Sequence, residues 1–149
     1  MEAGLRKLFY IILMTAVFIS SSIMLSFSSE SKKNIKEVHV IAYYFHGTFR
    51  CSTCRKLEQY SKEAIEANFN DAIASGKLEF KTVNVEDKGN EHYAKDYQLY
   101  TKSLILSLLK NGKEVKSENL SKIWEYVGNK QRFVDYVKRE VADFLQEDK

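Results

Sequence analysis

The sequence predicts one α/β domain built on a four-stranded mixed sheet with helices on both faces. In its first half, two runs rich in β-branched and aromatic residues flank a long amphipathic segment, the pattern of parallel strands joined by a helix. In its second half, a nearly all-apolar run leads into Asn111-Gly112, a strong hairpin signal, and an amphipathic helix closes the chain. The element order is therefore βαβ and a short helix, then ββα.

The first half is expected to form a right-handed parallel crossover. The long helix carries apolar side chains at spacings of three and four, and Gly76 suits its C-terminal cap because glycine tolerates a left-handed conformation. The expected elements are the strand Val38–Phe45, the helix Ser52–Ala74, the strand Leu78–Val85 and the short helix Glu91–Tyr97.

The second half is expected to form an antiparallel hairpin backed by a helix. An almost wholly apolar strand suits a position covered on both faces, whereas the charges of the returning strand suit a sheet edge. Asn129 is the candidate N-cap of the last helix, against which we expect Trp124 to pack. The expected elements are the strands Ser103–Leu109 and Lys113–Ser117, a turn or short helix over Leu120–Val127, and the helix Lys130–Leu145.

The N-terminal segment, 1–29, has the pattern of a signal peptide or an N-terminal membrane anchor. Leu8–Phe27 contains no charged residue and follows Arg6-Lys7, and a helix of this length could span a bilayer. Cleaved and anchored forms both remain open, and only the uncleaved form would contact the membrane. A polar linker, 30–37, then leads to the domain, 38–149. Both forms place the domain outside the cytoplasm, in a periplasm or at the cell surface.

Composition limits the functions that the 149-residue chain can have. Its formal net charge is +3, which is too weak and too scattered to indicate a nucleic-acid partner. No fingerprint for a flavin or a nicotinamide nucleotide occurs, so we expect no cofactor.

The two cysteines of the chain, Cys51 and Cys54, form a CSTC motif between a strand and a helix. The free N–H groups and dipole of a helix N-terminus stabilise a thiolate there. We therefore predict that Cys51, nearer the loop, attacks a substrate disulfide, and that Cys54 resolves the mixed disulfide. A protein dithiol or disulfide, or a membrane redox partner, would then exchange electrons with the pair.

Two other roles for the pair were weighed. A stabilising disulfide is a weak explanation, because closing so short a loop removes little entropy from the unfolded chain. A metal site is a stronger one, with Cys51, Cys54 and His46 as the best ligand set and His39 and His92 as further candidates. The alternative function is a non-catalytic module that binds a metal, a metalloid or a partner protein through these thiols.

Several segments resemble the thioredoxin superfamily. The best are FHGTFRCSTC (45–54) and VNVEDKGNEHYAKDY with SLILSLLKNGKEV (83–97 and 103–115). More narrowly, YYFHGTFRCSTC, DYQLYTKS and IWEYVGNKQRFVDYV resemble small bacterial thioredoxin-like proteins that are often labelled as a nitrophenyl-compound nitroreductase subunit. The resemblance implies a thioredoxin-like fold and thiol–disulfide exchange.

The chain departs from the thioredoxin pattern at two positions. The resemblance places Lys102-Ser103-Leu104 where thioredoxins have a cis-proline facing the dithiol, and we expect a trans peptide with Ser103 nearest the sulfurs. It also places Tyr44, or its neighbour Tyr43, where thioredoxins have a buried acid, and tyrosine is a poor base at neutral pH.

Two residues beside the motif are candidate supporting residues. His46 could stabilise the thiolate as an imidazolium or could simply shape the loop. Arg50, directly before Cys51, could lower the pKa of the thiol, hold an acidic substrate or be solvated.

Overall fold

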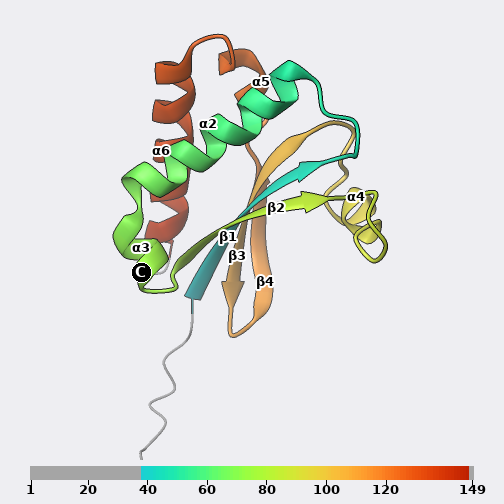
Figure 1. The fold of residues 1–149 in the computed structure, drawn as a ribbon. Coiled ribbons are helices and arrows are strands. Elements are labelled where there is room, and N and C mark those ends of the chain that lie inside the picture. The colour runs from blue at the N-terminus through green and yellow to red at the C-terminus, as the bar shows by residue number, and fades with distance from the viewer. Residues whose placement is uncertain (1–37, 148–149) are drawn as a thin grey trace, which may run out of the picture. The chain divides into compact units, whose positions relative to one another are not determined.

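In the computed structural model, the described residues are 38–147 (Figure 1). The predicted signal or anchor segment, 1–29, and the predicted linker, 30–37, lie outside the described residues. Within the described part of the chain, no helix is long and apolar enough to cross a membrane.

The order of elements follows the predicted one. The strands and helices are β1 (Val38–His46), α2 (Ser52–Asn68), α3 (Asn70–Ala74), β2 (Leu78–Asn84), α4 (His92–Asp96), β3 (Ser103–Lys110), β4 (Lys113–Asn119), α5 (Ile123–Tyr126) and α6 (Lys130–Gln146).

The sheet has the strand order β2-β1-β3-β4. β1 pairs in parallel with β2, while β3 is antiparallel to both of its neighbours, β1 and β4. Helices α2 and α6 lie on one side of this sheet and α4 on the other (Figure 1). The predicted α/β fold, a thioredoxin-like mixed sheet with helices on both faces, is confirmed by this topology.

The alternating side chains of β1 separate the two layers of the core. Tyr44 is fully buried in the main cluster, which also contains Leu57 of α2 and Phe133 of α6. Tyr43 and Phe45, which point the other way, pack against Tyr93 of α4. This two-sided burial fixes β1 at the centre of the fold, and the functional loop leaves the sheet where β1 ends.

The expected helix Ser52–Ala74 is interrupted. Phe69 leaves the helical region (φ −131°, ψ 32°), so that α2 ends at Asn68 and α3 follows. This break lets the Phe69 side chain pack against the core cluster. The Asn68 side-chain amide donates to the carbonyl of Ala64 at 2.8 Å, which satisfies one of the last carbonyls of the helix.

Both expected helix caps are present, but Trp124 is placed differently from our expectation. Gly76 adopts a positive φ of 72° after α3, and the Asn129 side-chain oxygen accepts the Arg132 N–H at 3.1 Å. Trp124 does not join the core beneath α6, since its side chain is 37% exposed and its indole reaches toward the segment before β3.

Candidate redox site

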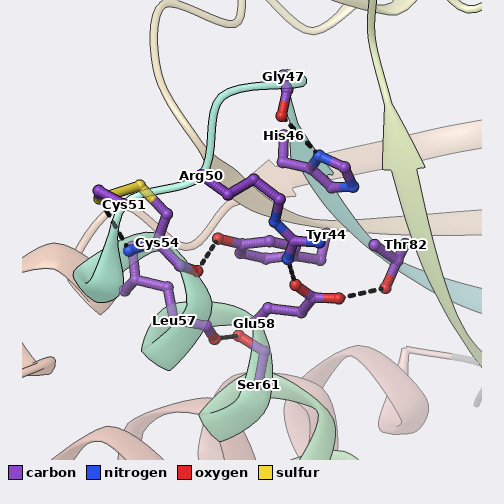
Figure 2. Close-up of polar contacts among 10 residues, drawn as sticks. All are labelled: Tyr44, His46, Gly47, Arg50, Cys51, Cys54, Leu57, Glu58, Ser61 and Thr82. Atoms are coloured by element: carbon purple, nitrogen blue, oxygen red, sulfur yellow. Dashed lines mark hydrogen bonds and ion pairs between the residues drawn. A yellow bond between two sulfur atoms is a disulfide. The ribbon is translucent and has the colours of Figure 1, made fainter. Parts of the chain in front are cut away.

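Cys51 and Cys54 are joined by a disulfide, with their Cα atoms 5.0 Å apart (Figure 2). Cys51 is the N-cap of α2, with extended backbone angles (φ −73°, ψ 168°). Its Sγ accepts the backbone N–H of Cys54 at 3.1 Å. A helix N-cap normally uses a serine, threonine or asparagine oxygen for this bond. In α2, a free N–H of the first turn is directed at sulfur instead.

The two sulfurs differ in access to solvent. Cys51 is half-buried, whereas Cys54 is only 3% exposed. An external disulfide can therefore approach Cys51 more easily than Cys54. This asymmetry agrees with the predicted roles of attacking and resolving thiol.

Tyr44 lies beneath the pair. Its hydroxyl donates to the carbonyl oxygen of Cys54 at 2.7 Å, which ties the first turn of α2 to β1 (Figure 2). Burial raises the pKa of Tyr44 to about 12, although the positive charge of Arg50 opposes this shift. At neutral pH, Tyr44 is thus a hydrogen-bond donor and not a proton acceptor.

Arg50 is neither solvated nor directed at the sulfurs. Its side chain runs past the Tyr44 ring to Glu58 of α2, with which it forms an ion pair (Figure 2). Both side chains are about three-quarters buried, with 26% and 24% exposed. Thr82 of β2 donates to the other Glu58 oxygen at 3.5 Å, which is at the limit of a hydrogen bond.

Glu58 was not predicted from the sequence, although a signal was present. It follows Cys54 by four residues and precedes Ser61 by three, and both of these neighbours on the helix surface are buried. A charged residue within a buried helical stripe calls for a partner, and the structure supplies Arg50.

His46 shapes the loop. Its Nδ1 lies 2.9 Å from the carbonyl oxygen of Gly47, and it points away from the disulfide (Figure 2). His39 lies near the start of β1, and His92 is on α4. In the described residues, no group of three or more His, Cys, Asp or Glu side chains is placed to hold a metal ion. The ligand set Cys51, Cys54 and His46 is therefore not brought together.

A second contact fixes the loop before Cys51. The Glu86 carboxylate accepts the backbone N–H of Thr48 at 3.0 Å. Hydrogen bonding to the Thr48 side chain and then to this N–H holds the pKa of Glu86 below its usual value. A Cβ at Gly47 would collide with Glu86 Oε1, so a larger residue there would force the carboxylate to shift. This contact could not be predicted from local sequence, because it joins residues 38 positions apart.

The segment before β3 approaches the same end of the sheet. Ser103 pairs with Phe45 across the sheet and is 4% exposed, and its hydroxyl donates to the carbonyl of Thr101 at 3.0 Å. No peptide bond of the described residues is cis, in line with the expectation for Lys102-Ser103. The Trp124 indole N–H donates to the Lys102 carbonyl at 2.9 Å.

A small cleft opens beside these contacts. Its walls are residues 45–47 and 85–86, together with the segment 99–102. Tyr100 lines this cleft and is 94% exposed. The cleft provides a surface next to the dithiol loop.

The comparisons with known proteins give weak similarities. No protein-family profile and no curated protein matches the chain. The X-ray structure of thioredoxin from Fasciola hepatica is 26% identical, with a TM-score of 0.34 over 60% of this chain and 79% of that one. The solution structure of a thioredoxin from Thermus thermophilus is 13% identical, with a TM-score of 0.36 over 60% of this chain and 72% of that one.

These similarities give no support to the narrower resemblance, to proteins labelled as a nitroreductase subunit.

Proposed function

We propose that this protein is an extracytoplasmic thiol–disulfide oxidoreductase that works through Cys51 and Cys54. The observation that carries the proposal is the asymmetric pair at the start of α2. The half-buried member caps the helix and accepts a backbone N–H, while the other is buried one turn further on. Backbone donors and the helix dipole favour the thiolate of Cys51, which is the nucleophile of disulfide exchange.

In the proposed reaction, atoms and electrons are exchanged only between the dithiol and the substrate disulfide. The Cys51 thiolate attacks one sulfur of a substrate disulfide and forms a mixed disulfide, and the other substrate sulfur leaves as a thiolate. The Cys54 thiol then loses its proton and attacks Cys51 Sγ, which releases the second substrate thiolate. Two electrons pass from the dithiol to the substrate, and the chain ends in the disulfide form seen in the structure.

Reduction of insulin by the full-length chain, with dithiothreitol as electron source, tests this activity. We expect turnover by the wild-type chain and none by Cys51→Ser. Cys54→Ser should still attack a disulfide but should be unable to resolve it. Mixed with 5,5′-dithiobis(2-nitrobenzoate), this variant should retain one thionitrobenzoate on Cys51, detectable by mass spectrometry.

A specific result would favour the alternative function. If the wild-type chain showed no turnover and bound zinc stoichiometrically through both cysteines, it would be a binding module and not an oxidoreductase. Such a site would need ligands beyond those gathered in the described residues.

The proposed location rests on the N-terminal segment, 1–29. Labelling of Cys51 in intact cells by a membrane-impermeant maleimide, after mild reduction, would support an extracytoplasmic domain. N-terminal sequencing of the mature chain would distinguish cleavage from anchoring. If only lysed cells were labelled, the domain would be cytoplasmic.

A recycling partner follows from the proposed chemistry. An exported dithiol has to be reduced or oxidised again after each turnover, by a protein dithiol or disulfide or by a membrane redox protein. The Cys54→Ser variant can trap that partner as a mixed disulfide on Cys51. The proposal does not extend to reduction of nitro groups, because the sequence carries no flavin or nicotinamide fingerprint.

A further inference from the structure

Among residues 38–147, the ion pair between Arg50 and Glu58 is the one charged contact that joins the loop of Cys51 to the helix of Cys54. Arg50 immediately precedes Cys51, and Glu58 lies one turn beyond Cys54. Both side chains are largely withdrawn from water, so their charges are screened less than those of exposed pairs.

The surroundings show that the guanidinium is held in place. Among the side chains of residues 38–147, Arg50 Nε is a buried nitrogen without a hydrogen-bond partner. Leaving such a donor unsatisfied is unfavourable, and Glu58 compensates by pairing with the other end of the guanidinium. Burial raises the pKa of Tyr44, and the ring lies close enough to Arg50 for its charge to oppose that rise.

We propose that Glu58 is a positioning residue that sets the redox equilibrium of the dithiol by cancelling the charge of Arg50, the residue that precedes Cys51. This inference rests on the proposed oxidoreductase function. An isolated cation next to Cys51 would stabilise its thiolate and hence the reduced form. The paired arrangement removes that bias, so the wild-type dithiol is a stronger reductant than a chain in which Arg50 acts alone.

The two partners should therefore act in opposite directions. Glu58→Gln leaves the Arg50 charge uncompensated and should favour the dithiol. Arg50→Met leaves the Glu58 carboxylate uncompensated and should favour the disulfide. The double variant carries neither charge and should return close to the wild-type equilibrium. A purely structural role for the pair would not give shifts of opposite sign.

The test is equilibration of the full-length chain with glutathione. In this reaction, the disulfide and two glutathione thiols give the Cys51 and Cys54 thiols and one glutathione disulfide. We expect each single substitution to change the equilibrium constant by about three- to tenfold, the effect of one uncompensated charge near a protein surface. A tenfold change corresponds to about 30 mV in reduction potential.

Glu66→Gln is the matched control. It removes one carboxylate from the same helix, at an exposed position paired with Lys62, and should leave the equilibrium constant unchanged. A urea titration of each variant checks that it is folded. If Glu58→Gln does not fold, Arg50→Met still tests the predicted shift toward the disulfide.

Two outcomes would overturn the proposal. If Glu58→Gln shifts the equilibrium while Arg50→Met does not, the carboxylate acts on the thiolate without Arg50. If both single variants shift the equilibrium in the same direction or not at all, the pair is only structural. In both cases wild-type insulin reduction would leave the proposed function intact, whereas a wild-type chain unable to exchange with glutathione would refute that function as well.

Discussion

Tyr44 illustrates how one buried side chain can support a reactive pair without taking part in proton transfer. It is fully buried, and its hydroxyl contacts backbone and not sulfur. The tyrosine therefore stabilises the position of Cys54 relative to β1. In the same region, the charged groups come from the loop and from α2, as Arg50 and Glu58.

Replacing Tyr44 by phenylalanine should lower the free energy of unfolding by about 1–2 kcal/mol, because the buried carbonyl of Cys54 loses its donor. Urea denaturation of the oxidised chain would measure this loss. Tyr100→Phe removes the same group from a side chain that is 94% exposed and should have almost no effect. Equal losses in the two variants would show that the hydrogen bond contributes nothing.

The same tyrosine predicts a loss of stability in alkali. Its pKa is about 12 in the folded chain and 10.0 as the reference value, so the folded state keeps the proton longer. The stabilisation is complete below pH 10.0 and is lost as the pH rises toward 12, since the unfolded state ionises first. Unfolding measured across this range should show a smaller alkaline decline for Tyr44→Phe. A decline identical to that of the wild-type chain would contradict the assignment.

At the scale of elements, the start of each long helix is fixed by a side-chain cap. Cys51 caps α2 with sulfur, and Asn129 caps α6 with an amide oxygen. Only the first cap changes when the protein is reduced or oxidised. The second belongs to the scaffold, because α6 packs against α2 and covers the sheet.

Asn129→Ala should therefore destabilise the fold by about 1 kcal/mol, the usual effect of losing an N-cap. Thermal unfolding would show this as a lower Tm, with an unchanged equilibrium with glutathione. Asn129→Ser keeps an oxygen acceptor and should restore most of the stability. A changed redox equilibrium in Asn129→Ala would mean that α6 communicates with the dithiol.

The loop before Cys51 predicts how the stability of the fold changes in acid. Hydrogen bonding to the Thr48 side chain and then to its backbone N–H lowers the pKa of Glu86. This carboxylate therefore stabilises the fold above its usual pKa, and the contribution is lost as the pH falls through the lower folded value. Gly47→Ala should displace Glu86 and remove this part of the pH dependence. Thermal unfolding across the acid range should give the same profile for Gly47→Ala and Glu86→Gln. An unaltered profile for Gly47→Ala would show that Glu86 keeps its contact.

The elements could be predicted because their signals are local. The hairpin at Asn111-Gly112, the apolar β3 and the cap at Asn129 all depend on neighbours in sequence. The break at Phe69 could not be predicted, because it depends on packing against the core.

The candidate site was predictable only in part, for the same reason. The sequence placed the dithiol at a helix start, since this needs only a strand, two cysteines and a helix. It missed Glu58, Glu86 and the position of Trp124, because each contacts a residue brought close only by the fold. The roles of His46 and Ser103 in catalysis stay predictions.

At the scale of the whole molecule, the hydrophobic cluster that stabilises the fold and the redox pair occupy largely separate positions. The main cluster joins the sheet to α2 and α6 through side chains such as Leu57, Phe133 and Val137. Cys54 is buried beside this cluster but is not a member of it. The domain should therefore remain folded in both redox states, as a reversible dithiol requires.

Reduction should lower the free energy of unfolding by about 2 kcal/mol, because a four-residue loop constrains the unfolded chain only slightly. A single cooperative transition should remain in urea, with and without reductant.

The thermodynamic cycle adds a second requirement. Folding stabilises the disulfide by the same free energy by which the disulfide stabilises the fold. About 2 kcal/mol therefore corresponds to a roughly thirtyfold shift in the glutathione equilibrium between folded and unfolded chains. Glutathione titrations in buffer and in concentrated urea would measure that shift independently. If reduction abolished the cooperative transition, the disulfide would be a structural staple and not a working redox pair.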